Sequence, residues 1–224
     1  MIDLESRIEE IKSNLVSKNF KYIIKCKYKT IPAKEKDIYD EEKVKEYNYY
    51  VKLIKKLKKH IKDSSDIQFY TRYDKFNNLV CLVSKFDINE IYINLNIDIR
   101  IIIGDKYDTY MKATYYQEKC GILYLEEFVS GNRKNGYGSM LLDNLNFIID
   151  NINSRLKNYN NYSETYNFKP IKILKGRAIP FKSVISQEDL NKLYTKYGFK
   201  IDNNNYLLKN RRYFLLLYSS KYRE

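Results

Sequence analysis

Two glycines, Gly136 and Gly138, stand one residue apart in a chain that contains only seven glycines. They follow an apolar stretch with strand character and precede a run with helical spacing, so they mark a strand-to-helix turn. Backbone amides converge at such a turn, and a residue without a Cβ lets the main chain approach an anion. Arg133 and Lys134 add positive charge, and Ser139 can donate from the first helical turn. The pattern predicts a phosphate-binding turn.

Other readings of the turn remain open or are excluded by its spacing. A tight strand-to-helix connection without any ligand would use the same two glycines. A dinucleotide fingerprint is excluded, because the third glycine and the parallel βαβ unit around it are missing. A P-loop is excluded as well, because no Gly-Lys-Ser or Gly-Lys-Thr follows.

A second motif downstream makes the turn more specific. The two motifs together resemble those of the GNAT superfamily of acetyl-CoA-dependent N-acetyltransferases. The family's phosphate motif is Arg or Gln, two residues, Gly, one residue, and Gly or Ala, which residues 133–138 match. Its later motif is an aromatic or aliphatic residue, Tyr, three residues, and Gly-Phe, which residues 193–199 match. The resemblance is sharp over residues 122–199 and only compatible before them.

The resemblance implies a fold and a domain organisation. We expect an α+β (α/β) single-domain GNAT-like fold over residues 19–224, with a mixed, mainly antiparallel sheet and helices on both faces. A helical extension is expected to precede it at residues 1–18. In the family, the strand before the turn splays from the strand after the helix, and the pantetheine arm of the cofactor lies in the wedge. Here the wedge strands would be residues 122–129 and 171–174.

The resemblance also implies acetyl-CoA as the acetyl donor and a primary amine as the acceptor. That acceptor could be a small molecule, a peptide or a protein lysine. Gln187 stands where the family carries a pantetheine-contacting asparagine. The residues expected to contact the cofactor are Phe128, Val129, Ser130, Arg133, Lys134, Asn135, Gly136, Tyr137, Gly138, Ser139 and Gln187.

Candidates for proton transfer follow from the same alignment of motifs. Tyr194 occupies the position of the family's general-acid tyrosine, and a phenol with a pKa near 10 suits a thiolate leaving group. Alternatively, Tyr194 could be one more aromatic residue on the apolar face of a helix. The glutamate base of many relatives falls on Ile122 here, so we look to Glu126 and Glu127 on the same strand. One of two adjacent residues should face the apolar wedge with a raised pKa, although solvated edge glutamates fit as well.

Hydrophobic periodicity predicts the elements that position these motifs. Helical spacing occurs at residues 4–15, 40–63, 138–156 and 186–198, where Ser186 is a candidate N-cap and Gly198 a candidate end. Long loops are expected at residues 157–169 and 176–185. Strand patterns occur at residues 20–28, 67–70, 79–86, 91–103, 109–116, 122–129, 171–174, 206–208 and 213–218.

The size and net charge of the chain indicate further possible partners besides acetyl-CoA and an amine. A chain of 224 residues that is 44% hydrophobic can bury one sizeable core, and its net charge of +13 favours a polyanion. The polyanion could be nucleic acid, an anionic membrane surface or a phosphorylated cofactor, and the acceptor amine could belong to a nucleic-acid-bound partner. The basic run at residues 55–62 could lie along such a polyanion, although a solvated helix face is the commoner reason for it. The alternative function is therefore a non-catalytic basic binding protein on the same scaffold.

The remaining reactive residues exclude other chemistries. His60 is the only histidine, which rules out a histidine-dependent triad and a multi-histidine metal site. Cys26, Cys81 and Cys120 are odd in number and far apart, so they predict reduced thiols and no metal site. The sequence lacks a long apolar run and a signal-peptide pattern, so we expect a cytoplasmic protein without a membrane span.

Overall fold

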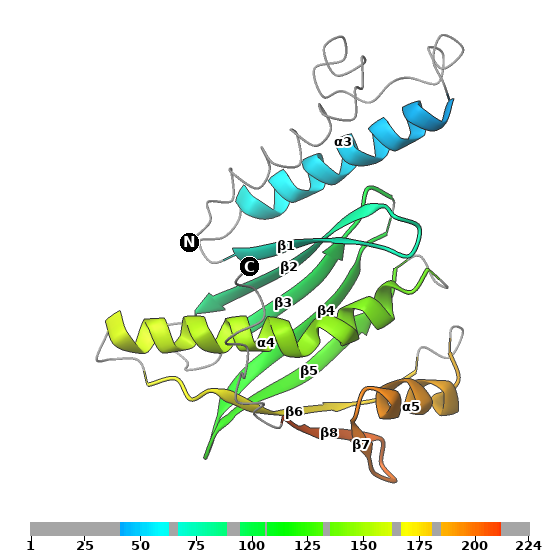
Figure 1. The fold of residues 1–224 in the computed structure, drawn as a ribbon. Helices are drawn as coiled ribbons and strands as arrows, with labels where there is room; N and C mark the ends of the chain where they lie inside the picture. The colour runs from blue at the N-terminus through cyan, green and yellow to red at the C-terminus, as the bar shows by residue number, and fades with distance from the viewer. Residues whose placement is uncertain are drawn as a thin grey trace, which may run out of the picture. The chain divides into compact units, whose positions relative to one another are not determined.

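We describe the protein from a computed structural model of the chain (Figure 1). The structure describes residues 41–62, 67–88, 95–105, 107–131, 135–162, 167–180 and 185–211. The extension expected at residues 1–18 and the strands expected at 20–28 and 213–218 lie outside them. The helices are α3 (Glu41–Lys62), α4 (Tyr137–Tyr162) and α5 (Gln187–Lys196). The strands are β1 (Ile67–Tyr73), β2 (Leu79–Ile88), β3 (Leu95–Ile102), β4 (Thr109–Gln117), β5 (Gly121–Val129), β6 (Ile171–Arg177), β7 (Lys200–Ile201) and β8 (Tyr206–Asn210).

The strands form one mixed sheet of eight in the order β1-β2-β3-β4-β5-β6-β8-β7. β5 and β6 are parallel, as expected for strands joined through a helix, here α4. β1 pairs with β2 in the antiparallel direction, and β8 pairs with both β6 and β7 in that direction. The predicted α+β class, a mixed sheet with helices, is therefore confirmed.

The described residues divide into two compact units. The first comprises those within Met1–Ile88, Asn96–Lys112 and Glu127–Leu145. The second comprises those within Asn89–Leu95, Ala113–Glu126 and Asn146–Glu224. Strands β3, β4 and β5 and helix α4 each contribute residues to both units.

In the first unit, α3 covers β1 and β2 as its amphipathic sequence predicts (Figure 1). Its apolar stripe, which includes Tyr47, Ile54 and Leu57, is buried against a cluster that contains Leu79 and Ile102. The side chains on the other faces of the helix are exposed lysines: Lys52, Lys55, Lys58 and Lys59. The basic run is thus a solvated face of a helix whose other face is core.

In the second unit, α5 begins and ends where the sequence predicts. The hydroxyl of Ser186 accepts a hydrogen bond from the backbone nitrogen of Asp189, so Ser186 is the N-cap. Gly198 takes a φ of +79°, the left-handed conformation that ends many helices. Leu190 and Tyr194 on one face of the helix are buried.

The structure corrects two expected loops. Helix α4 continues to Tyr162, six residues into the loop expected at 157–169. Asn160 fixes the chain there, because its Nδ2 donates to the carbonyl of Phe168 at 2.8 Å and its Oδ1 accepts from that residue's backbone nitrogen at 2.7 Å. β6 continues to Arg177, because Arg177 still pairs with Tyr206 of β8, so the loop expected at 176–185 starts later.

Candidate functional site

The turn before α4 belongs to the first unit. Gly136 takes a φ of +83°, which side-chain-bearing residues rarely adopt. The backbone nitrogen of Met140 donates to the carbonyl of Gly136 at 2.9 Å, the first bond of the helix. The amides of Tyr137, Gly138 and Ser139 therefore come before the first intrahelical bond, where a helix presents its donors to an anion. Of the remaining predicted residues, Arg133 and Lys134 lie outside the described residues.

The two glycines are required for different reasons. A Cβ added to Gly136 would meet nothing within 4 Å, so its backbone conformation alone demands glycine. A Cβ added to Gly138 would lie 3.1 Å from Oγ of Ser130 and 3.4 Å from Cζ of Phe128. Gly138 is thus the point at which the helix start approaches the end of β5 most closely, and a larger residue would push the two apart.

The side chain of Tyr137, the first residue of α4, is hydrogen-bonded to Asp74. Asp74 lies in the turn between β1 and β2. The Tyr137 hydroxyl donates to Oδ2 of Asp74 at 2.7 Å, and both side chains are buried. Oδ1 of Asp74 accepts from the backbone nitrogens of Phe76 at 2.9 Å and Asn78 at 2.8 Å. Burial, followed by the bond to Asp74, raises the pKa of Tyr137 well above its ordinary value. Tyr137 can therefore contact a ligand only through its backbone.

Sequence reasoning missed Asp74. The signal that marks it is local, because Asp74 opens a tight turn in which Asn77 takes a φ of +62°. Nothing in that turn indicates that the second carboxylate oxygen accepts a bond from a residue 63 positions away.

The end of β5 is fixed to the start of β4 within the first unit. The backbone nitrogen of Gly131 donates to Oγ1 of Thr109 at 3.0 Å, and a Cβ at Gly131 would lie 2.5 Å from the carbonyl oxygen of Asp108. Val129 and Ser130, which precede this anchor, are exposed. Phe128, Asn135 and Ser139 are half-buried.

The strands expected to form the wedge are adjacent and parallel. In the second unit, β5 pairs with β6 from Gly121 opposite Ile171 to Leu125 opposite Gly176. The pairing ends there, although β5 itself continues to Val129. The last residues of β5, from Glu126 to Val129, therefore extend beyond the described pairing with β6.

The two candidate bases do not meet the condition set for them. Glu126 and Glu127 are both exposed, so neither is buried in an apolar wedge. Oε1 of Glu126 accepts from Oγ1 of Thr114 at 2.5 Å. Glu127 accepts from Nζ of Lys112 at 2.8 Å and from the hydroxyl of Tyr110 at 2.9 Å. These bonds, with Lys112 first, lower the pKa of Glu127, so the expected raised value is wrong for this residue.

Tyr194 is a buried residue of the second unit. Only 5% of it is exposed, and its ring meets Phe199 edge-on at 5.4 Å between centroids. Burial raises the pKa of its hydroxyl to about 12. Tyr194 is therefore part of the apolar face of α5, and in this environment it is a weaker proton donor than a solvated phenol.

Gln187 is bonded within the second unit. Its Nε2 donates to the carbonyl of Ala178 at 3.0 Å and to Oδ1 of Asn191 at 2.8 Å. These bonds connect the first turn of α5 to the residue that follows β6. They use the amide hydrogens that would otherwise reach a pantetheine arm.

The other reactive residues take structural positions. His60 is half-buried, and burial lowers its pKa. Cys81 is fully buried, and burial raises the pKa of its thiol to about 12, while Cys120 is half-buried and Cys26 lies outside the described residues. Within the described part of the chain, no three histidine, cysteine, aspartate or glutamate side chains gather as a metal site would require. None of the described helices combines the length and apolarity needed to cross a membrane.

Comparison of the chain with protein-family models, with curated proteins and with solved structures found no match in any of the three. The function is therefore inferred from the chain's own residues. Those residues gather in the first unit at one turn, where Gly136, Gly138 and Ser139 begin α4 and the Asp74 to Tyr137 hydrogen bond supports it.

Proposed function

We propose that the protein is an N-acetyltransferase that transfers the acetyl group of acetyl-CoA to a primary amine. The observation that carries this proposal is the turn at the start of α4. There a left-handed glycine and a closely packed glycine begin a 26-residue helix, and successive backbone amides at its positive end precede the first intrahelical hydrogen bond. Such a terminus suits the pyrophosphate of coenzyme A, and the resemblance of residues 133–138 to the GNAT phosphate motif supports that ligand.

The residues at the turn fit a phosphorylated cofactor in both geometry and charge. Gly138 has no Cβ where one would press on Ser130 and Phe128, so the main chain is kept close to the end of β5. Ser139 adds a hydroxyl at the first helical turn, and Arg133 and Lys134 add two positive charges from the sequence. The main chain at the end of β5, Phe128 to Ser130, follows the last residue of β5 that pairs with β6 and is the segment proposed to bond the pantetheine amides.

Acetyl-CoA supplies an activated acyl group, so the protein's part is to bind both substrates and to move protons. Tyr194 remains the proposed donor to the leaving thiolate on the strength of its position in the second motif. Its pKa of about 12 requires that ligand binding improve its acidity before it could serve in that role. Neither Glu126 nor Glu127 has the environment of a general base, so a water-mediated base or an amine that arrives neutral is the proposed route for the acceptor's proton.

The proposal is tested by thermal unfolding of the full chain with and without acetyl-CoA. A ligand at one hundred times its Kd stabilises the folded state by about 2.7 kcal/mol, which for a chain of this size raises Tm by roughly 5 to 10 °C. Dephospho-CoA and free pantetheine separate phosphate recognition from pantetheine recognition. Acetylation of polyamines, lysine peptides and aminoacyl-tRNA then identifies the acceptor class. A Tm that does not move with acetyl-CoA contradicts the proposal.

A second candidate function is a binding protein on the same scaffold that performs no acetyl transfer. The exposure of Glu126 and Glu127 and the burial of Tyr194 favour it, because these are the groups that would have to move protons. Its prediction is a steep salt dependence of binding to a polyanion, with no effect of acetyl-CoA on Tm.

A further inference from the structure

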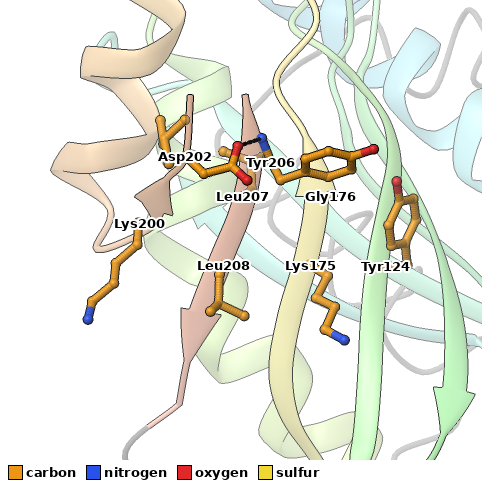
Figure 2. A pocket seen from close by; sticks show the side chains of 9 residues that line it. Tyr124, Lys175, Gly176, Lys200, Asp202, Tyr206, Leu207 and Leu208 are labelled. Atoms are coloured by element: carbon orange, nitrogen blue, oxygen red, sulfur yellow. Dashed lines mark hydrogen bonds between the residues drawn. The ribbon is translucent and has the colours of Figure 1, made fainter. Parts of the chain in front are cut away.

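A groove of about 460 Å³ crosses the C-terminal strands of the second unit. Its lining comes from β5, β6, β7 and β8 and includes Tyr124, Lys175, Lys200, Tyr206 and Leu208. Figure 2 shows the ring of Tyr206 lying across β6 toward Tyr124, with the side chain of Lys175 below the two rings and that of Lys200 farther away, beyond Leu208. No residue of the proposed acetyl-CoA site lines this groove.

The strand register places these side chains on one face of the sheet. Tyr124 pairs with Lys175, Lys175 pairs with Leu208, and Leu208 pairs with Lys200. Directly paired residues on neighbouring strands point to the same face, so these four form a row across β5, β6, β8 and β7. With about 4.8 Å between strands, the row is roughly 14 Å long. Arg177 lies two residues after Lys175 on β6 and pairs with Tyr206 of β8, so this pair extends the same face.

The face carries exposed aromatic rings. Tyr206 is 48% exposed, and Tyr116 of β4 is 39% exposed. Tyr116 and Tyr124 meet edge-on with 6.4 Å between ring centroids, so Tyr116 continues the aromatic surface onto β4. Water-exposed rings on a rigid sheet are platforms on which the faces of nucleic-acid bases can stack.

Lys175, Arg177 and Lys200 place positive charge on this face, and the exposed carboxylate of Glu126 lies on the same face, two residues along β5 from Tyr124. Neither Lys175 nor Lys200 makes an ion pair with any residue that the structure describes, and the guanidinium of Arg177 lies 5.4 Å from the centroid of the Tyr206 ring. Asp202 alone is acidic among the described residues that line the groove. Its Oδ1 accepts from the backbone nitrogens of Asn204 at 2.9 Å and Tyr206 at 2.8 Å. Asp202 therefore stabilises the turn that precedes Tyr206, and its carboxylate is engaged by these hydrogen bonds. The lysines of the groove can attract an anion.

We propose that this face, formed by Tyr116, Tyr124, Lys175, Arg177, Lys200 and Tyr206, binds single-stranded nucleic acid. Rings that stack bases and cations spaced along the same strands match the alternation of bases and phosphates in a single strand. A duplex hides its base faces and so would use the cations alone. An acidic protein surface could also pair with the cations, and competition with a single strand distinguishes it, because only the bases can stack on the exposed rings of Tyr116 and Tyr206. The inference is independent of the proposed acetyl transfer, because none of its residues belongs to the acetyl-CoA site.

The test is fluorescence anisotropy of the full chain with a labelled oligothymidylate of about 15 nucleotides, at the upper end of common site sizes. We expect binding at about 100 mM salt. Tyr206→Ala should weaken it about tenfold or more, as expected for loss of one stacked base, and Tyr206→Phe should retain it. Lys175→Gln and Lys200→Gln should each reduce the slope of log affinity against log salt by about 0.7. An oligouridylate of the same length distinguishes RNA from DNA as the preferred strand.

Matched controls come from exposed residues of the first unit. Tyr73→Ala removes a tyrosine that is 58% exposed, and Lys52→Gln removes an exposed lysine of α3 that lies outside the basic run at residues 55–62; both should leave affinity unchanged. The proposal is overturned if these controls weaken binding as much as the groove variants do. It is also overturned if duplex DNA or inorganic polyphosphate binds as tightly as the single strand, or if no binding occurs. Loss of acetyl-CoA binding in the turn variants would leave this result untouched, so the two proposals fail separately.

Discussion

The hydroxyl of Tyr137 donates a 2.7 Å hydrogen bond to Oδ2 of Asp74, a residue 63 positions earlier in the chain. This bond connects the first residue of α4 to the turn between β1 and β2, inside the first unit. Oδ1 of the same carboxylate caps that turn. Asp74 thus joins the turn between β1 and β2 to the start of α4, where the phosphate-binding turn is proposed.

Tyr137→Phe should lower the free energy of unfolding by about 1 to 3 kcal/mol, because it leaves a buried carboxylate oxygen with one donor fewer. Urea unfolding measures the change, and Tyr73→Phe, at a tyrosine that is 58% exposed, is the control with no expected effect. The variant should also bind acetyl-CoA more weakly, because the start of α4 loses its support. A stability equal to that of the wild type would mean that the hydrogen bond contributes nothing.

Tyr194→Phe should change the stability of the protein at alkaline pH. The folded-state pKa of about 12 lies above the ordinary value of 10.0, so Tyr194 contributes stability that is complete below pH 10 and is lost as pH rises through 12. Two pKa units correspond to roughly 2 to 3 kcal/mol. The variant should therefore lose less stability than the wild type between pH 10 and 12 in urea unfolding. Curves that stay parallel over this range would contradict the burial of the hydroxyl.

The same variant tests the chemistry. If Tyr194 donates a proton to the leaving thiolate, Tyr194→Phe should lower kcat and leave the affinity for acetyl-CoA nearly unchanged. A wild-type kcat would assign Tyr194 to the apolar core alone.

Gly136→Ala and Gly198→Ala are a matched pair, because both glycines have a positive φ, +83° and +79°. Each substitution should cost about 1 to 2 kcal/mol of stability from backbone strain, since neither added Cβ meets an atom closer than 3.8 Å. Only Gly136→Ala should also weaken acetyl-CoA binding. Equal effects of the two variants on ligand affinity would argue against a phosphate role for the turn.

Lys56 differs from its neighbours on the basic face of α3. Its Nζ donates to Oδ1 of Asp108 at 2.7 Å and to the carbonyl of Asp105 at 2.5 Å, and the Lys56 and Asp108 side chains are 26% and 17% exposed. Lys56→Met should therefore cost about 1 to 2 kcal/mol in urea unfolding, whereas Lys55→Met should cost little. The assignment of Lys56 to the structure rather than to polyanion binding is wrong if the two variants are equally stable.

Local signals were sufficient for most of the fold. Sequence spacing predicted three features that depend only on residues close in the chain. They are the apolar stripe on α3, the alternation in β3 and the N-cap at Ser186. The end of α4 was not predictable in this way, because it depends on the hydrogen bonds between Asn160 and Phe168, which are eight residues apart. β7 was missed because two residues give no periodicity.

The features of the candidate site also differ in whether the local sequence predicts them. The glycines of the turn were predictable, because a left-handed φ and a missing Cβ are properties of one residue type. The direction of the Tyr137 ring, the bonds of Glu127 and the burial of Tyr194 were not, because each depends on a partner supplied by another element. Asp74 gave no sign of its second role, since the sequence around it describes only a turn.

The central claim is most directly tested by calorimetric titration of acetyl-CoA into the wild type, Arg133→Glu and Gly138→Leu, with Gly198→Ala as the control. We predict binding to the wild type and to the control, and loss of binding in both turn variants, with folding of each verified by circular dichroism. Unchanged affinity in Arg133→Glu and Gly138→Leu would show that the turn does not bind the pyrophosphate, and would contradict the proposed function.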